Sequence, residues 1–219
     1  MKHKACIDLV PMFNTLSDKE KDAIAVISKS KYYEKGELLF DQGSKSGDLY
    51  IVHKGHVKIS RYTFDGKEQI IRTLKPGSFT GELSLFSEQT HHNFAMVLDN
   101  TEICLLEGDA FKNLLLEMPH ISIKLLEAVT DRLGQSETRI KDLGTKDVES
   151  RIAKHLLDLA NGVKLVKIPY SKGEMASLLG TSPETLSRNL KRLQTNGLIR
   201  MEGQRKFHLI NKEGLEALI

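Results

Sequence analysis

Residues 171–193 carry the local signals for two short helices joined by a tight turn. Ser171 and Glu174 form a capping box that starts the first helix, and Gly180 ends it. A serine and a proline at positions 182–183 supply the N-cap and the first helical residue of the second helix. Because two helices separated by a short turn with glycine are typical of a helix-turn-helix, we predict that motif here.

The second helix of this pair has an apolar face and a polar face. At 100° per residue, three leucines share one side of the helix: Leu186, Leu190 and Leu193. The other side carries Glu184, Ser187, Arg188 and Lys191. We expect the leucines to pack and the polar face to remain in solvent.

Three side chains of the polar face have the chemistry that reads base edges in the major groove of DNA. Arg188 donates to O6 and N7 of guanine, Glu184 accepts from the amino group of cytosine, and Ser187 does either or touches a thymine methyl. Phosphate contacts are expected from the polar and basic residues Ser171, Lys172, Thr181, Ser182, Lys191, Arg192, Arg205 and Lys206. The alternative is a solvated helix pair that binds nothing.

A predicted hairpin and an imbalance of charge also favour DNA binding by the C-terminal part of the chain. Residues 198–201 and 206–210 alternate in hydropathy around a turn with glycine, which predicts a wing that carries Arg200, Arg205 and Lys206. Residues 145–219 hold 13 basic and 8 acidic side chains, a net +5, whereas residues 1–144 hold 19 and 21, a net −2. This asymmetry favours a polyanionic partner for the C-terminal third.

Between residue 34 and about residue 107, glycines separate short segments rich in β-branched and aromatic residues. The clearest segments are 48–52, 57–62, 69–74 and 103–106. Strands at a spacing of about ten residues predict a small antiparallel sandwich or barrel. The first 30 or so residues are expected to be helical, with an N-cap at Ser17.

After Pro119 the apolar pattern becomes that of a long helix. Alternating intervals of three and four place six residues at the a and d positions of about three heptads: Leu126, Val129, Leu133, Ser136, Ile140 and Leu143. A helix of about 23 residues is about 35 Å long, which suits a parallel dimer better than the core of a small barrel. A helix within an intramolecular bundle is the alternative. Gly144 and Thr145 are interpreted as a hinge.

The chain has no apolar run long enough to span a bilayer, so we expect no membrane partner. Residues 1–8 lack the apolar core of a signal peptide and show no lipoprotein anchor around Cys6. The expected location is cytoplasmic.

Taken together, these motifs resemble the CRP/FNR superfamily of bacterial transcription regulators over nearly the whole chain. Residues 81–86, Gly-Glu-Leu-Ser-Leu-Phe, are similar to the effector-cassette signature, and the 126–143 stripe is similar to the dimerisation helix. Residues 184–188, Glu-Thr-Leu-Ser-Arg, are similar to the recognition helix of the FNR branch, in which Glu, Ser and Arg read a TTGA-type half-site. Residues 91–95 also resemble that branch.

The resemblance implies an α+β chain in three parts. These are an antiparallel β-roll sensor domain like those that bind cyclic nucleotides (1–118), a dimerisation helix and hinge (119–144), and a winged helix-turn-helix DNA-binding domain (145–219). It also implies a homodimer on an inverted repeat in double-stranded DNA, and contact with RNA polymerase if the protein is an activator.

The effector cassette departs from that of the cyclic-AMP binders. Those proteins carry Arg-Ser about ten residues after the cassette glutamate, and the matching positions here are His92 and Asn93. A neutral imidazole cannot replace a bidentate guanidinium on a phosphate, so cyclic AMP is not the expected ligand and Glu82 is expected to be structural. Another small-molecule effector stays open. The cassette residues are Gly81, Glu82, Leu83, His92 and Asn93.

Two cysteines, Cys6 and Cys104, are the candidate sensor thiols. An iron–sulfur cluster as in FNR takes four thiolates, so no such cluster is expected. The chain resembles instead the two-cysteine FNR-like regulators, in which the pair is a proposed disulfide switch. Disulfides are rare in the cytosol and tend there to be redox-sensing, which fits that reading. The alternative is a buried strand cysteine and an unrelated thiol near the N-terminus.

A remote alternative from another class is a cupin-like metalloenzyme. It requires a compact set of histidine and glutamate ligands on adjoining strands. His53 and His56 are three residues apart, which places them on opposite faces of a strand. We therefore expect no metal site and no enzymatic activity.

Overall fold

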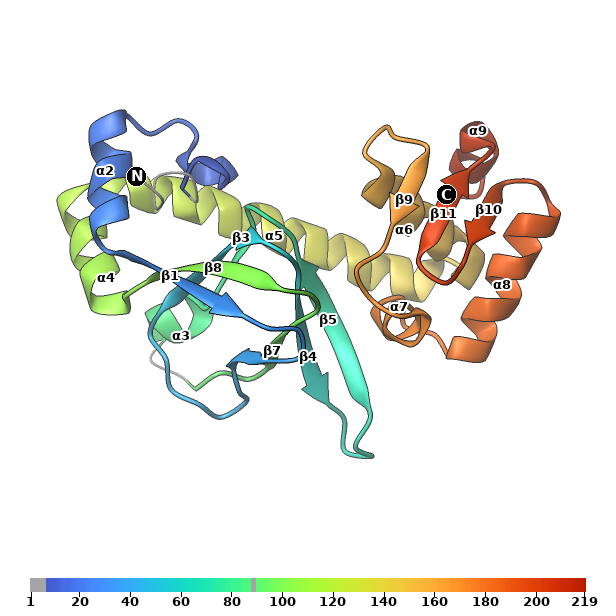
Figure 1. Cartoon of the computed structure of the whole chain (residues 1–219), viewed down its shortest axis with the longest axis horizontal. Helices are drawn as coiled ribbons and strands as arrows, with labels where there is room; N and C mark the ends of the chain where they lie inside the picture. The colour runs from blue at the N-terminus through green and yellow to red at the C-terminus, as the bar shows by residue number, and fades with distance from the viewer. Residues whose placement is uncertain (1–6, 88–89) are drawn as a thin grey trace. The chain divides into compact units, whose positions relative to one another are not determined.

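The computed structural model describes residues 7–87 and 90–219. The chain divides into two compact units, and the boundary falls between Leu133 and Gly134. The first unit holds two β-sheets with flanking helices, and the second holds helices around a small sheet (Figure 1).

In the described part of the first unit, the strands form two antiparallel sheets of four strands each. Their orders are β1-β8-β3-β6 and β2-β7-β4-β5. The strands are β1 (Ser28–Tyr33), β2 (Leu38–Phe40), β3 (Leu49–Lys54), β4 (Val57–Tyr62), β5 (Glu68–Leu74), β6 (Phe79–Thr80), β7 (Phe94–Val97) and β8 (Thr101–Leu106). The predicted antiparallel sandwich is confirmed.

The sheet that contains β3 and β8 is buried on both faces. Ile51 and Cys104 are paired across these strands and belong to one hydrophobic cluster. The neighbouring pair, Tyr50 and Leu105, belongs to a second cluster that also contains residues of β4 and β7. Burial on both faces explains why these strands read as continuous apolar runs rather than alternating ones.

The described helices of the first unit are η1 (Pro11–Phe13), α2 (Asp18–Val26), α3 (Glu82–Ser87), α4 (Gly108–Glu117) and the beginning of α5 (Pro119–Thr145). The N–H of Ser17 donates to Glu20 Oε2 at 2.6 Å, which confirms the predicted helix start. The prediction of helix up to residue 30 is wrong at its end, because β1 begins at Ser28. That strand is a polar edge strand whose pairing with β8 is long-range, so local periodicity does not reveal it.

Helix α5 carries a stripe of apolar residues that are exposed within the single chain. Leu126, Leu133 and Ile140 lie seven residues apart and are 65%, 59% and 71% exposed. Val129 is half-buried and packs against the core of the first unit. Of the other residues predicted at a and d positions, Ser136 is exposed and Leu143 is 43% exposed. The predicted helix is confirmed, and its outward face runs through Leu126, Leu133 and Ile140.

The second unit contains the end of α5, a three-stranded antiparallel sheet of order β10-β11-β9 and further helices. Its elements are α6 (Val148–Ala160), β9 (Leu165–Lys167), α7 (Lys172–Leu178), α8 (Pro183–Thr195), β10 (Ile199–Glu202), β11 (Lys206–Leu209) and α9 (Lys212–Glu216). Strands β10 and β11 confirm the predicted wing. Helix α6 ends at Asn161, which has a left-handed backbone conformation. Strand β9 adds a third strand that the sequence did not indicate.

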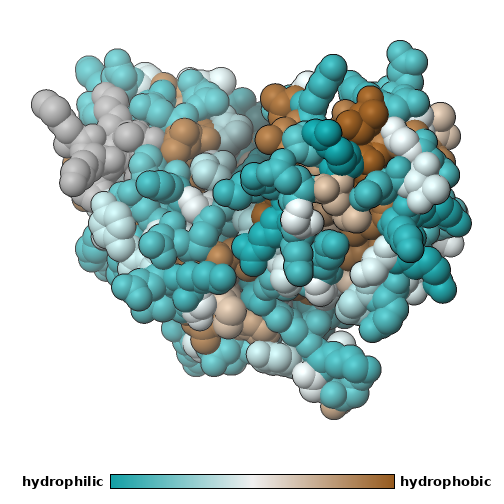
Figure 2. Space-filling view, turned by 45° about the vertical axis from the view of Figure 1, so that its right-hand side comes forward, coloured by the Kyte–Doolittle hydropathy of each residue, from teal (hydrophilic) through white to brown (hydrophobic). Residues whose placement is uncertain are grey.

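On the face shown in Figure 2, hydrophilic residues predominate and hydrophobic residues form patches between them. None of the described helices is both long and apolar enough to cross a membrane.

Candidate functional site

Helices α7 and α8 form the predicted helix-turn-helix. Ser171 Oγ accepts from the N–H of Glu174 at 3.2 Å, and the N–H of Ser171 donates to Glu174 Oε2 at 2.8 Å, which completes the capping box. Ser182 Oγ accepts from the N–H of Thr185 at 3.2 Å, at the start of α8. Gly180 in the turn has φ +63°, a conformation that favours glycine, and a Cβ there would lie 2.8 Å from the end of the Leu143 side chain.

The two faces of α8 separate as the sequence predicts. Its three leucines are fully buried at 0% exposure. The predicted base-reading residues Glu184, Ser187 and Arg188 are exposed, as is Lys191. Because the buried face fixes the rotation of the helix, these four side chains are presented together to solvent.

The polar face holds both signs of charge. The backbone N–H of Glu184 and then the Ser182 hydroxyl lower the pKa of the Glu184 carboxyl, so it is an ionised acceptor at neutral pH. Within the described residues, Arg188 enters no hydrogen bond or ion pair, and its guanidinium is available to a ligand. This pair of side chains supplies an acceptor and a bidentate donor one turn apart.

Arg192 has a partner that sequence analysis did not identify. Its Nη2 forms an ion pair with Oε2 of Glu149 on α6, and the Glu149 side chain is only 11% exposed. Hydrogen bonding to Glu149 and its charge raise the pKa of Arg192. The pair joins α8 to α6, and phosphate contact by Arg192 stays a prediction.

The wing also compensates part of its own charge. Lys206 Nζ lies 2.6 Å and His208 Nε2 3.0 Å from the carboxylate of Glu202. Hydrogen bonds from Lys206 and then from His208 lower the pKa of Glu202 to about 2. Arg205 is exposed and donates to the carbonyl of Pro169 at 3.5 Å. The remaining predicted phosphate contacts are exposed at Ser182 and half-buried at Ser171, Lys172 and Thr181.

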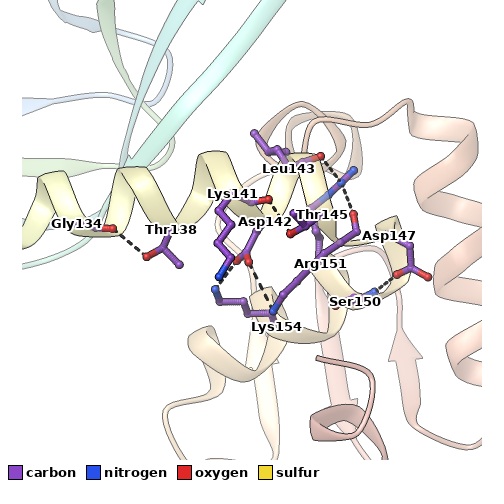
Figure 3. Close-up of polar contacts among 11 residues, drawn as sticks. Gly134, Thr138, Lys141, Asp142, Leu143, Thr145, Asp147, Ser150, Arg151 and Lys154 are labelled. Carbon is purple, nitrogen blue, oxygen red and sulfur yellow. Dashed lines mark hydrogen bonds and ion pairs between the residues drawn. The ribbon is translucent and has the colours of Figure 1, made fainter.

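The junction between α5 and α6, where a hinge was predicted, is held by side chains (Figure 3). Asp142 lies 2.5 Å from Lys154 Nζ, and Arg151 donates to the carbonyls of Lys146 at 2.8 Å and Leu143 at 3.4 Å. Thr145 Oγ1 donates to the carbonyl of Lys141 at 2.8 Å. These contacts lie within the second unit and join α6 to residues 142, 143 and 146, on either side of the predicted hinge residues.

In the first unit, the cassette residues Gly81, Glu82 and Leu83 lie at the start of α3, and His92 and Asn93 come directly before β7. Gly81 has φ +101°, and a Cβ there would collide with the carbonyl oxygen of Asp48, so glycine is required. Leu83 is 63% exposed and His92 is exposed. Asn93 is half-buried, and its Oδ1 is buried without a hydrogen-bond partner among the described residues. Neighbouring His91 is buried and stacks on Phe40 at 3.8 Å between ring centroids.

Glu82 is held by two arginines that sequence analysis missed. Its Oε1 lies 2.5 Å from Arg132 Nη1 on α5 and 3.5 Å from Arg72 Nη2 on β5. Arg132 also donates to the carbonyl of Phe79 at 3.1 Å and lies over its ring at 4.2 Å. In the sequence, the signal for this group of Glu82 and two arginines was Arg72, a charged residue within the apolar segment 69–74.

Of the two candidate thiols, the structure describes one. Cys104 lies on β8, is fully buried, and belongs to the cluster that includes Ile7 and Leu106. Cys6 lies outside the described residues. Among the described residues, no group of three or more histidine, cysteine, aspartate or glutamate side chains is placed to hold a metal ion.

Comparisons with known proteins match both units. A cyclic nucleotide-binding domain model matches residues 30–118, and a Crp-like helix-turn-helix domain model matches residues 150–218. The chain is 31% identical over 214 residues to the probable transcriptional regulator flp of Lacticaseibacillus casei, with 97% of both chains covered. It is 31% identical over 195 residues to the CRP-like cAMP-activated global transcriptional regulator of Mycobacterium tuberculosis, which covers 84% of this chain and 87% of that one.

Among solved structures, FixK2 from Bradyrhizobium japonicum matches with a TM-score of 0.81 at 25% identity. The match covers 88% of this chain and 97% of that chain. The curated relatives named above are transcriptional regulators and not enzymes.

Proposed function

The chain belongs to the CRP/FNR superfamily of bacterial transcription regulators, and on that premise we propose that it binds a palindromic TTGA-type site in double-stranded DNA as a homodimer. The exposed face of α8 carries this proposal. Arg188 matches guanine, Glu184 matches the amino group of cytosine, and Ser187 lies between them on the same face. A cytoplasmic location and, for an activator, contact with RNA polymerase are part of the same proposal.

The outward stripe of α5 supports the homodimer. Leu126, Leu133 and Ile140 are three large apolar side chains at heptad spacing, and each is more than half exposed in the single chain. Pairing of identical helices about a two-fold axis would bury all three. Two recognition helices related by that axis require half-sites about 10 base pairs apart, centre to centre.

The dimer is tested by sedimentation of the full chain and of Leu133→Glu. We expect a dimer for the wild type, a monomer for the variant, and at least a tenfold loss of affinity for a duplex with TTGA and TCAA inverted half-sites. Thr130→Glu, one turn away on α5 and exposed, is the matched control for added charge. A wild-type monomer that still binds the palindrome with full affinity contradicts the proposal.

We further propose that oxidation controls DNA binding through Cys6 and Cys104. The proposal is supported by Ile7, the neighbour of Cys6 in sequence, which lies in the same hydrophobic cluster as Cys104. Two cysteines cannot supply the four thiolates of a cluster, so the proposal includes no iron–sulfur centre. It also excludes cyclic AMP as the effector, because His92 and Asn93 stand where the phosphate-binding arginine and serine are required.

The redox proposal is tested by titrating the palindrome with protein that has been reduced or mildly oxidised. We expect affinity to differ between the two states in the wild type and to be equal in Cys6→Ser. A redox effect that persists in Cys6→Ser, or none in the wild type, contradicts this mechanism and leaves DNA recognition unaffected.

A further inference from the structure

The last turns of α5 contact the helix-turn-helix within the second unit (Figure 1). Arg139 and Leu143 lie four residues apart, on the same face of α5. Nη2 of Arg139 donates to the carbonyl of Leu178, the last residue of α7. A Cβ at Gly180 would lie 2.8 Å from Cδ2 of Leu143, so this leucine lies against the turn between α7 and α8. Both contacts therefore reach the point where α7 turns towards the recognition helix.

The carbonyl that Arg139 binds belongs to the end of α7. The N–H groups of Gly180 and Thr181 donate to the carbonyls of residues 177 and 176, at 3.1 and 3.0 Å, and close a Schellman motif. That motif supplies no donor to the carbonyl of the next residue, Leu178. Arg139 supplies the donor, and it places a positive charge at the negative end of the helix.

The start of α7 is held in the same region. Tyr170 directly precedes the N-cap Ser171, and its Oη lies 2.5 Å from Nε2 of His155 on α6. Arg139 is half-buried there, where burial lowers its pKa and Tyr170 opposes that change. Side chains of α5 and α6 thus hold both ends of α7.

The neighbour of Arg139 in sequence belongs to the outward stripe of α5. Ile140 is 71% exposed and lies on the face proposed to pair in the homodimer. Ile140, Arg139 and the recognition helix α8 all lie in the second unit. The position of α8 relative to the proposed dimer seam at Ile140 therefore depends on how firmly α7 is held on the end of α5.

We propose that Arg139 is a positioning residue that sets the half-site spacing which the protein accepts. Together with Leu143 it holds the end of α7 and the following turn, and so fixes the direction of α8 relative to Ile140. One added base pair moves a half-site by about 3.4 Å and turns it by about a tenth of a helical turn. A firmly held α8 cannot follow that shift. The inference rests on the proposed function, because it requires a homodimer on an inverted repeat.

The test uses three duplexes with TTGA and TCAA half-sites. One has the spacing that the wild type prefers, and the others have one base pair added or removed. The affinities of the full-length wild type and of Arg139→Ala are measured at fixed salt. We expect the wild type to lose about tenfold or more on each altered duplex, because base contacts at one half-site are lost. Arg139→Ala should lose less than about threefold between duplexes, and should bind the best duplex more weakly because α8 is less well ordered beforehand.

Two further variants separate positioning from charge. Arg139→Lys keeps a cationic donor for the carbonyl and should restore most of the spacing preference. Lys141→Ala also removes one positive charge from α5, at an exposed position two residues away, and should keep the wild-type preference. Thermal unfolding establishes that each variant is folded at the assay temperature. If Arg139→Ala is unfolded, Leu143→Ala takes its place, because it removes the contact with the turn and should also weaken the spacing preference.

The inference is wrong if the wild type binds all three duplexes equally, or if Arg139→Ala, or Leu143→Ala in its place, keeps the wild-type ratio of affinities. It is also wrong if Arg139→Lys restores nothing or if Lys141→Ala loses the preference as well. In each of these cases a wild type that prefers the palindrome to a scrambled duplex leaves the proposed function standing. A wild type without that preference contradicts the proposed function itself, so the two failures are distinguishable.

Discussion

Arg192 on the second helix of the helix-turn-helix is ion-paired with Glu149 on α6, a residue 43 positions earlier in the chain. The Glu149 side chain is only 11% exposed, and Arg192 supplies a positive charge next to its carboxylate. This ion pair joins α8 to α6 at the surface. Leu186, Leu190 and Leu193 hold the opposite, buried face of α8. We therefore expect the orientation of α8 to depend on this ion pair as well as on its buried leucines.

Substitutions of Arg192 and Lys191 are expected to separate an effect on stability from an effect on the electrostatic part of DNA binding. Arg192→Ala should lower the melting temperature, because it leaves Glu149 buried without a partner. Lys191→Ala is the matched control: it should leave the melting temperature unchanged and reduce the slope of log affinity against log salt by about 1 per subunit. Calorimetry and salt-dependent titrations measure the two effects. An unchanged melting temperature for Arg192→Ala would show that the ion pair contributes nothing.

Gly134 lies inside α5, and a Cβ at that position meets nothing within 4 Å. Glycine in a helix interior costs about 0.5–1 kcal/mol relative to alanine, so Gly134→Ala should stabilise the protein by about that amount. Gly81→Ala is the contrasting variant and should destabilise, because its φ is +101° and the carbonyl of Asp48 blocks a Cβ. Urea unfolding measures both, and a destabilised Gly134→Ala would show that α5 needs a flexible residue there.

His155 on α6 should make the second unit sensitive to acid. Burial, followed by the charge of Arg139, lowers the pKa of His155 to about 4, and its Nε2 lies 2.5 Å from Tyr170 Oη. An unfolded histidine has a pKa of about 6.5, so between pH 6.5 and 4 the unfolded state binds the extra proton. The stabilising contribution is therefore complete above pH 6.5 and is lost as the pH falls, by up to about 1.4 kcal/mol per pH unit.

Urea unfolding at pH 7.5 and pH 5 tests this contribution. His155→Gln should show a smaller loss of stability on acidification than the wild type. His92→Gln, an exposed position in the other unit, is the matched control and should behave as the wild type does. Equal losses for wild type and His155→Gln would rule out His155 as the titrating group.

The features that sequence analysis predicted correctly have local causes. Caps at Ser171 and Ser182, the leucine face of α8 and the wing turn are each specified by residues within one or two turns, and the structure confirms them. What sequence analysis missed depends on distant partners. Strand β1 is stabilised by its pairing with β8, which is distant in sequence. Arg72 and Arg132 come together at Glu82, which Arg132 follows by 50 residues.

The partners of the predicted phosphate-contact residues could not be predicted from the sequence either. Charge and position along the chain identify Arg192 and Lys206 as basic residues beside the recognition helix and on the wing. They do not reveal that Glu149 and Glu202 are their partners, because an ion pair across elements leaves no periodic pattern. Arg188 has no such partner in the described part of the chain, and it is therefore the sharper probe of recognition.

A double-mutant cycle between Arg188 and the guanine of the TTGA half-site tests whether the exposed face of α8 reads DNA sequence. Wild type and Arg188→Ala are titrated at fixed salt against the palindrome and against a palindrome in which that guanine pair is replaced. We predict that Arg188→Ala costs about 1–3 kcal/mol per half-site on the intact palindrome and almost nothing once the guanine is gone. Equal losses on both duplexes would show that Arg188 contacts phosphate only, and would contradict base recognition by this helix.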